Sequence, residues 1–227
     1  TNISFGTVTA SKSVALTTIP RKTEISDLTA TMGSTVTITL SRKSSNFTHT
    51  LKYKFGSATG TIVTGAGASA SWTIPKTLAN QIPNAITGSG KLICETYSGS
   101  TLVGTSTSTL KLTVSADALP SLTGITVEET IASVKSLGIC VQSKSKLKIT
   151  ITGAAGSYSS TIKSYTITVD DQTIYASSGT TAEIKSSGTL TIKATITDSR
   201  GRSASKNMTI AVAAYSPPKL TSYSAAR

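Results

Sequence analysis

The 227-residue chain has few side chains that are suited to catalysis or to metal binding. Its single histidine, His49, and its two cysteines, Cys94 and Cys140, lack the paired spacing of a zinc site. No Gly-x-Ser-x-Gly elbow is present. The adjacent Asp170 and Asp171 fit a hairpin turn better than a calcium site, because nothing nearby supplies further oxygen ligands. We therefore predict no catalytic residues, no metal and no cofactor, and so no enzyme.

Aromatic side chains and long apolar runs are also scarce. Aromatic residues make up 5% of the chain and charged residues 14%, and no stretch approaches the roughly 18 consecutive apolar residues of a membrane helix. We expect no membrane insertion. The Val, Ile and Leu residues recur at regular intervals, which excludes a disordered tail. Cys94 and Cys140 are predicted to lie in different domains, unbonded to each other, as small buried thiols of a protein assembled in a reducing compartment.

Strict alternation of apolar and polar residues is the dominant pattern. In residues 47–55 the large side chains, His49 among them, share one face, and Thr or Lys occupies the other. This period of two is typical of a β-strand with one buried face, so His49 is predicted to be a core or interdomain histidine. Turn sequences at 98–100, 170–171 and 199–202 separate such runs. Residues 75–83, between two prolines, favour a single helical turn.

The chain divides into two halves that are each long enough for about seven strands. The sequence therefore predicts an all-β fold of two tandem immunoglobulin-like or fibronectin III-like β-sandwiches with partial flanking segments. We assign 1–21 to the end of a preceding domain or a linker strand, 22–116 to the first sandwich, 117–214 to the second, and 215–227 to a linker or the start of a following domain. Prolines at both boundaries should hold neighbouring domains semi-rigidly in a row.

The chain is strongly basic, with 22 Lys and Arg against 10 Asp and Glu and a net charge of +12. Such an excess is typical of proteins with a polyanionic neighbour, although solubility alone also explains it. Three lysines at a spacing of two predict a stripe on the wet face of a strand, and three basic residues flank a hairpin turn. Protection of a sheet edge by lysine explains the stripe equally well. The candidate contacts for a polyanion or a partner are Lys144, Lys146, Lys148, Arg200, Arg202 and Lys206.

Other ligands have less support in the sequence. Trp72 is a weak candidate for a glycan contact, because its position near Ile74 on an alternating segment fits the core better. We expect no nucleic-acid binding, since no helix is present for the major groove and no aromatic pair stands on a wet strand.

Several segments of the sequence are similar to those of a known family. They are residues 44–51, 71–75, 141–145, 197–202 and 215–218. With these segments the chain resembles minor structural proteins, of the tail or fibre, from siphoviruses that infect Gram-positive bacteria. The resemblance implies a virion component that is assembled in the bacterial cytoplasm. It also implies other tail or baseplate proteins and further copies of the chain as partners, with host cell-wall polysaccharide or teichoic acid as a candidate contact.

The favoured hypothesis is a non-enzymatic structural component of a phage tail, baseplate or fibre. Its tandem immunoglobulin-like modules would act as spacers that support or contribute to host-surface attachment. Two alternatives stay open. One is a secreted bacterial surface adhesin, in which similar Thr-rich sandwiches occur, and the other is a carbohydrate-binding immunoglobulin-like module.

Overall fold

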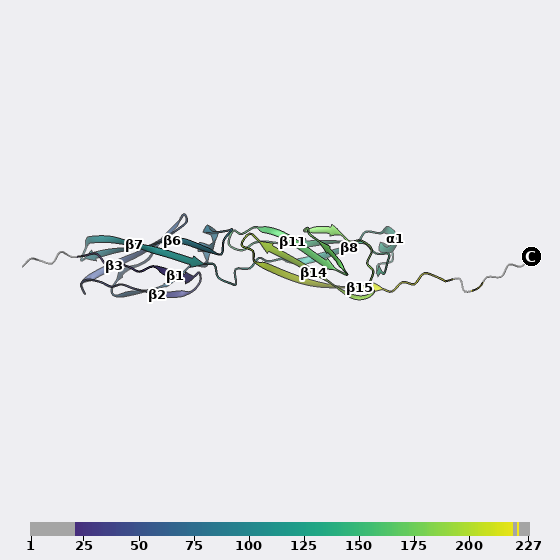
Figure 1. Cartoon of the computed structure of the whole chain (residues 1–227), viewed down its shortest axis with the longest axis horizontal. Helices are drawn as coiled ribbons and strands as arrows, with labels where there is room; N and C mark the ends of the chain where they lie inside the picture. The colour runs from purple at the N-terminus through teal and green to yellow at the C-terminus, as the bar shows by residue number, and fades with distance from the viewer. Residues whose placement is uncertain (1–20, 220–221, 223–227) are drawn as a thin grey trace, which may run out of the picture.

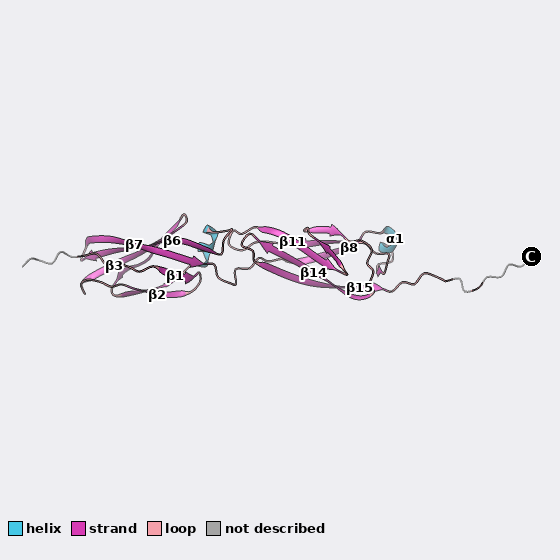
Figure 2. Cartoon of the chain, in the orientation of Figure 1, coloured by secondary structure: helices cyan, strands magenta, loops and turns pink. Residues whose placement is uncertain are grey.

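The structure is a computed structural model that describes residues 21–219 and 222. Figure 1 shows an elongated molecule in which two β-rich parts follow one another along the long axis. We call the part built on β1–β7 domain 1 and the part built on β8–β15 domain 2. Figure 2 shows strands throughout both parts, with one short helical turn near the same end of each. The predicted all-β fold is therefore confirmed. The assignments for 1–20 and for 220–221 and 223–227 lie outside the described residues.

Domain 1 is a sandwich of a five-stranded and a two-stranded sheet. The larger sheet has the order β1 (Leu28–Thr31), β7 (Thr101–Thr113), β6 (Thr87–Ser98), β3 (Phe47–Phe55) and β4 (Ala58–Ala66). The smaller sheet pairs β2 (Thr35–Thr39) with β5 (Ser69–Thr73). Leu51, Leu92, Leu110 and Ile74 are fully buried in the core of this domain. The three leucines lie on strands in which buried residues alternate with more exposed ones, so one face of each strand is buried, and Ile74 directly follows β5.

Domain 2 repeats this architecture with a five-stranded and a three-stranded sheet. The larger sheet has the order β12 (Gln172–Ile174), β11 (Ile162–Val169), β14 (Gly188–Asp198), β15 (Ser203–Ala213) and β9 (Cys140–Val141). The smaller one has the order β13 (Ser178–Thr180), β10 (Leu147–Thr152) and β8 (Gly124–Glu129). Its core is separate from that of domain 1 and includes Leu147, Ile149, Ile167, Ile192 and Ile196. Each domain is thus an immunoglobulin-like or fibronectin III-like β-sandwich.

A short strand joins the last strand of each domain in parallel. In domain 1, β1 pairs with β7, with Leu28 opposite Leu110. In domain 2, β9 pairs with β15, with Cys140 opposite Val212. All the other strand pairs of the described residues are antiparallel. The sequence did not indicate these parallel pairs, because β1 and β9 are too short to show a clear period.

The predicted turns are confirmed. The 98–100 turn joins β6 to β7, the 170–171 turn joins β11 to β12, and the 199–202 turn joins β14 to β15. The helical turn predicted within 75–83 is the 3-10 helix η1 (Lys76–Gln81). A second turn of helix, α1 (Ala132–Lys135), lies between β8 and β9 and was not predicted. Along β15, Val212 is buried and Ile210 half-buried, whereas Met208, two positions before Ile210, is 37% exposed.

Candidate functional site: the junction between the two domains

The turn at 198–202 is organised around Asp198, whose side chain is fully buried. Its Oδ1 accepts hydrogen bonds from the backbone N–H groups of Arg200 (3.0 Å) and Arg202 (2.9 Å). Its Oδ2 accepts one from the Ser160 hydroxyl (2.9 Å). Gly201 has a φ of 79°, in the left-handed region that glycine adopts without strain. The sequence Asp-Ser-Arg-Gly-Arg therefore folds into a tight turn whose backbone is held by its own first residue.

Arg200 reaches from this turn into domain 1. The residue is 8% exposed, and its guanidinium donates four hydrogen bonds, all to backbone carbonyls. Two of them cross to the end of η1, from Nη2 to Ala79 (2.8 Å) and from Nε to Ile82 (3.3 Å). Carbonyls at a helix end lack intrahelical partners and carry partial negative charge, which a cationic donor matches. The other two hold the loop of domain 2 at Ser157 (2.7 Å) and Tyr158 (2.7 Å).

Burial shifts the titration of this guanidinium but does not neutralise it. Removal from water lowers the pKa of Arg200 below its usual value, and the nearby negative charge of Asp198 acts in the opposite direction. A guanidinium stays protonated in proteins, so the four donors persist at any pH at which the domain is folded.

Arg202 and Ser199 extend the contact to the linker between the domains. Arg202 Nη2 donates to the carbonyl of Val114 (2.8 Å), and Nη1 donates to those of Ala118 (3.1 Å) and Ser115. The Ser199 hydroxyl donates to the carbonyl of Pro83 (2.6 Å). Three side chains of one turn therefore bind the backbone of domain 1 and the start of the linker.

A second loop of domain 2 adds an apolar contact to the junction. Tyr158 packs against the core of domain 1, although it belongs to the chain of domain 2. Tyr158 and Ser159 both have positive φ values, 43° and 63°, which are rare for residues other than glycine. A Cβ on Gly156 would lie 1.9 Å from the carbonyl oxygen of Ser160, so only glycine fits there. The Ser159 hydroxyl donates to Asn80 Oδ1 (3.1 Å) across the junction.

The junction holds the two sandwiches in line (Figure 1). It combines a packed aromatic ring with hydrogen bonds from two cationic side chains, and it has the chemistry of a docking interface. Among residues 21–219 and 222, no three His, Cys, Asp or Glu side chains come together in a group that could hold a metal ion.

Comparison with known families decides what kind of protein has this junction. A family model described as "Siphovirus protein of unknown function (DUF859)" matches residues 2–227. The chain belongs to this siphovirus protein family. The resemblance to a siphovirus family is therefore confirmed. No curated protein matches the chain at a significant level.

Among solved structures, this siphovirus protein is similar to fibronectin(III)-like modules of Clostridium thermocellum CbhA. The identity is 16% over 84% of this chain and 91% of that chain, with a TM-score of 0.32. It is also similar to the YadV chaperone, with 10% identity over 83% of this chain and 98% of that chain and a TM-score of 0.28.

The structure corrects the placement of two predicted surface contacts of the siphovirus protein. Arg200 and Arg202 were grouped with the candidate polyanion contacts because they flank a turn. Their guanidinium groups instead bind backbone carbonyls in the junction. Lys206, on β15, is exposed, and its ammonium donates to the carbonyl of Thr123 (2.5 Å). Of these three residues, Lys206 alone keeps a position at which a large polyanion has access.

The three lysines of the predicted stripe lie in different environments. Lys148 is exposed on β10, directly opposite Glu128 of β8. Lys146 is half-buried just before that strand. Lys144 lies in a turn, where its ammonium stands 5.0 Å from the centre of the Tyr215 ring. The prediction of a continuous stripe on one strand is therefore wrong for Lys144 and Lys146, because β10 begins only at Leu147.

Trp72 does not offer a surface for stacking a sugar. Its side chain is 7% exposed and stacks on Tyr53, with ring centroids 5.3 Å apart and an angle of 24° between the planes. His49 is fully buried, as predicted. Its Nε2 lies 2.8 Å from the Thr23 hydroxyl, and its Nδ1 lies 3.0 Å from the carbonyl oxygen of Ala66. The histidine thus has hydrogen-bond partners on both ring nitrogens.

The two cysteines belong to different cores. Cys94 is buried in domain 1 and Cys140 packs against the core of domain 2. Burial raises the pKa of both thiols, which keeps them protonated and poorly reactive. Across the described part of the chain, no helix has the length and apolar character needed to cross a membrane.

Proposed function

We propose that this siphovirus protein is a non-enzymatic structural component of the virion, in the tail, baseplate or fibre. Its two sandwiches act there as a stiff spacer that supports or contributes to attachment to the host surface. The observation that supports this proposal most is the junction, where one turn and one aromatic ring fix domain 2 on domain 1. A spacer needs such coupling because a free hinge would not hold its ends apart.

The two unbonded cysteines and the absence of an aromatic platform at Trp72 favour this role over the two alternatives. A carbohydrate-binding module that grips sugar by stacking needs an exposed ring, and the single tryptophan stacks inside the protein. The family match favours a phage protein over a secreted bacterial adhesin. The partners in this proposal are other tail or baseplate proteins and further copies of the chain, and assembly takes place in the bacterial cytoplasm.

The experiment that tests the role is localisation of the chain on purified virions. Antibodies raised against the folded 227-residue protein would be bound to intact particles and imaged by electron microscopy. We expect label at a fixed position on the tail, and a constant amount of the chain per particle in quantitative mass spectrometry. Absence of the chain from purified particles, or label over the capsid alone, would refute the proposal.

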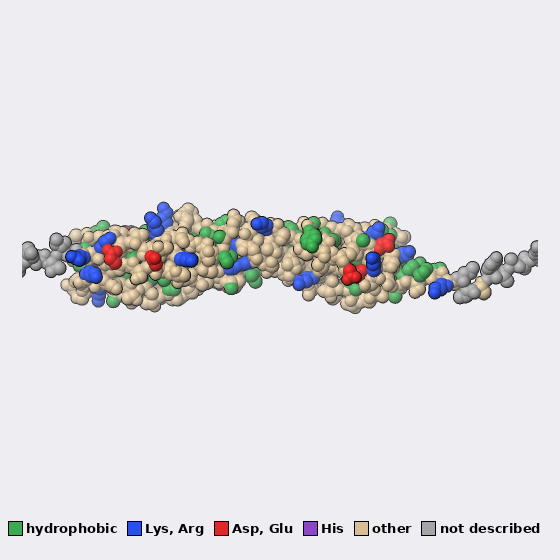
Figure 3. Space-filling view, in the orientation of Figure 1, with side chains coloured by type: hydrophobic (Ala, Val, Ile, Leu, Met, Phe, Trp, Pro, Cys, Tyr) green, Lys and Arg blue, Asp and Glu red, His purple; other side chains and the backbone are tan. Residues whose placement is uncertain are grey.

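A contact with an anionic wall polymer is a second proposal, which rests on the exposed lysines of domain 2. Figure 3 shows Lys and Arg side chains scattered over both domains with few acidic side chains among them. Lys144, Lys148 and Lys206 are exposed on domain 2, and a polyanion would screen their mutual repulsion. Binding to walls that bear teichoic acid should fall several-fold in the triple alanine variant and as salt is raised.

The matched control removes three exposed lysines of domain 1, Lys54, Lys91 and Lys111. It has the same net charge as the domain 2 variant. If both triple variants lose binding equally, the attraction comes from net charge and not from the surface of domain 2. Binding that ignores salt would exclude the electrostatic contact altogether.

A further inference from the structure

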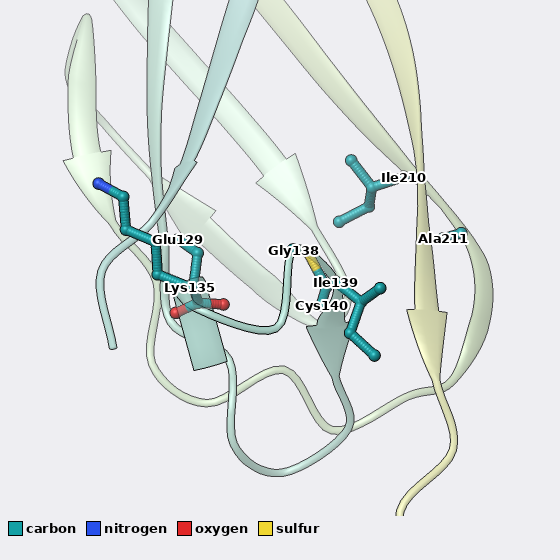
Figure 4. Close-up of a pocket in the computed structure, with 7 residues that line it drawn as sticks. All are labelled: Glu129, Lys135, Gly138, Ile139, Cys140, Ile210 and Ala211. Atoms are coloured by element: carbon teal, nitrogen blue, oxygen red, sulfur yellow. The ribbon is translucent and has the colours of Figure 1, made fainter. Parts of the chain in front are cut away.

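A cavity of about 350 Å³ opens at the pole of domain 2 that is remote from the junction. It lies among α1, the loop that follows α1, β9 and β15 (Figure 4). Six of the residues that line it are Glu129, Lys135, Ile139, Cys140, Ile210 and Ala211. This cavity has no part in the contacts between domains 1 and 2.

The carboxylate of Glu129 is only half satisfied in this cavity. Its Oε1 accepts hydrogen bonds from the backbone N–H groups of Ile131 (2.9 Å) and Lys146 (3.1 Å). Its Oε2 is buried and has no hydrogen-bond partner among the described residues. The nearby Lys135 does not fill this role, because its ammonium pairs with Glu128 (2.6 Å) and points away from the Glu129 carboxylate in Figure 4.

Glu129 is held in its charged form. Burial, the largest single influence, raises the pKa of this carboxyl, but hydrogen bonds from neighbouring groups, the Ile131 N–H first among them, outweigh it. The pKa therefore lies below its usual value. An ionised oxygen that is buried without a donor is unfavourable, and a cationic donor that entered the cavity would relieve this cost.

The rim of the cavity is apolar and exposed. Ile139, in the loop after α1, is 53% exposed, and Ile210 on β15 is half-buried. An arginine side chain matches both features, because its aliphatic stem covers apolar surface while its planar guanidinium binds a carboxylate. The cavity therefore has the chemistry of an arginine socket.

The first junction shows which kind of partner presents such an arginine. Figure 2 shows a helical turn at the same end of each domain, η1 in domain 1 and α1 in domain 2. The chain also leaves each domain at that end, after Thr113 in β7 and after Ala213 in β15. In domain 1 this pole receives Arg200 and Arg202 from a hairpin turn of the next sandwich.

We propose that the Glu129 cavity binds the guanidinium of an arginine presented by a turn of a neighbouring sandwich domain. The neighbouring turn would dock on domain 2 as the 198–202 turn docks on domain 1. The arginine would bind the Glu129 carboxylate, whereas Arg200 and Arg202 bind backbone carbonyls. This proposal rests on the proposed function in one respect, because it assumes that the neighbouring domain belongs to the same virion. The site itself is tested on the purified protein alone.

The test uses the 227-residue protein with 13C-labelled isoleucine methyl groups and a cyclic peptide that closes the sequence Asp-Ser-Arg-Gly-Arg into a turn. We expect saturable NMR shifts of the Ile139 and Ile210 methyl groups, with the buried Ile74 of domain 1 unmoved. A second peptide with citrulline in place of both arginines keeps the shape and removes the charge. It should bind at least ten-fold more weakly.

Two variants separate the cavity from general charge. Glu129→Gln should abolish the shifts, whereas Glu183→Gln, which removes the same charge from an exposed position of domain 2 outside the cavity, should leave them. Unchanged methyl signals of Ile149 and Ile192 in the core of domain 2 would show that each variant is folded. Equal binding of both peptides, or shifts that never saturate, would overturn the proposal. Neither result would alter where antibodies locate the chain on the virion.

Discussion

Removal of the two junction arginines should uncouple the domains without unfolding either one. Hydrogen bonds from charged donors contribute about 1.5–3 kcal/mol each. Two of the four bonds of Arg200 cross the junction, and the one to Ile82 is long at 3.3 Å. We expect Arg200→Ala to weaken docking by about 2–4 kcal/mol, which is roughly a 30- to 1,000-fold change in the docking equilibrium. The carbonyls of Ala79 and Ile82 would bind water once the domains separate, so no buried acceptor is left unpaired.

The double variant Arg200→Ala with Arg202→Ala removes every guanidinium contact of the turn. Small-angle X-ray scattering should then show a broader distribution of interatomic distances, and NMR relaxation should give a separate tumbling time for each domain. The wild-type protein should tumble as one elongated body. The matched control is Arg42→Ala with Lys43→Ala. It removes two basic residues from the loop before β3, which lies beside the β6–β7 turn at the opposite pole of domain 1.

A single tumbling time in the double arginine variant would refute this reasoning. It would mean that Tyr158, the Ser159 and Ser199 hydroxyls and the linker hold the domains without help from the guanidinium groups. Loss of the methyl signals of Ile74 or Ile192 would show instead that the arginines are needed to fold a domain, which also contradicts the prediction. Only separate tumbling of two folded domains agrees with it.

Three further predictions concern stability. Trp72→Ala should destabilise domain 1 by about 3–5 kcal/mol in urea unfolding and leave binding to cell walls unchanged. Gly156→Ala should lower stability by about 1–3 kcal/mol, because its Cβ would meet the Ser160 carbonyl, whereas Gly67→Ala, with a free approach, should have little effect in thermal unfolding. The hydrogen bond from Lys52 holds the pKa of Glu95 below 4.5. The contribution of this hydrogen bond to the stability of domain 1 should therefore be complete above that value. It should be lost as the pH falls through the lowered pKa. In the Glu95→Gln variant, the midpoint of urea unfolding should depend less on pH in this range. A dependence equal to that of the wild type would show that the Glu95 carboxylate does not stabilise the domain in this way.

The buried faces of the strands could be predicted because a period of two leaves little choice. Leu147, Ile149 and Ile151 alternate with polar residues, and all three are buried in the structure. The same logic places His49 in the core of domain 1. Each of these assignments depends only on neighbours along one strand, which is information that the sequence holds locally.

The destination of the arginines could not be predicted in this way. By its local sequence, Arg200 belongs to a hairpin turn, where arginine is usually exposed. Its burial depends on Ala79, 121 positions earlier in the chain and in another domain. The sequence did mark the turn, because residues 197–202 are among the segments shared with the siphovirus family. That signal shows where the chain is distinctive, but it does not show that the turn faces another domain.

The chemistry of the junction also bears on the net charge of +12. Arg200 and Arg202 are matched by backbone carbonyls, so they need no acidic partners, and two of the positive charges follow from how the domains are joined. Backbone carbonyls are present at the end of any sandwich, whatever its side chains. A turn that binds them can therefore dock on domains of unrelated sequence, provided that a helix end and a linker present the carbonyls at similar positions. A junction of this kind allows tandem domains to diverge in sequence while the rod that they form keeps its geometry.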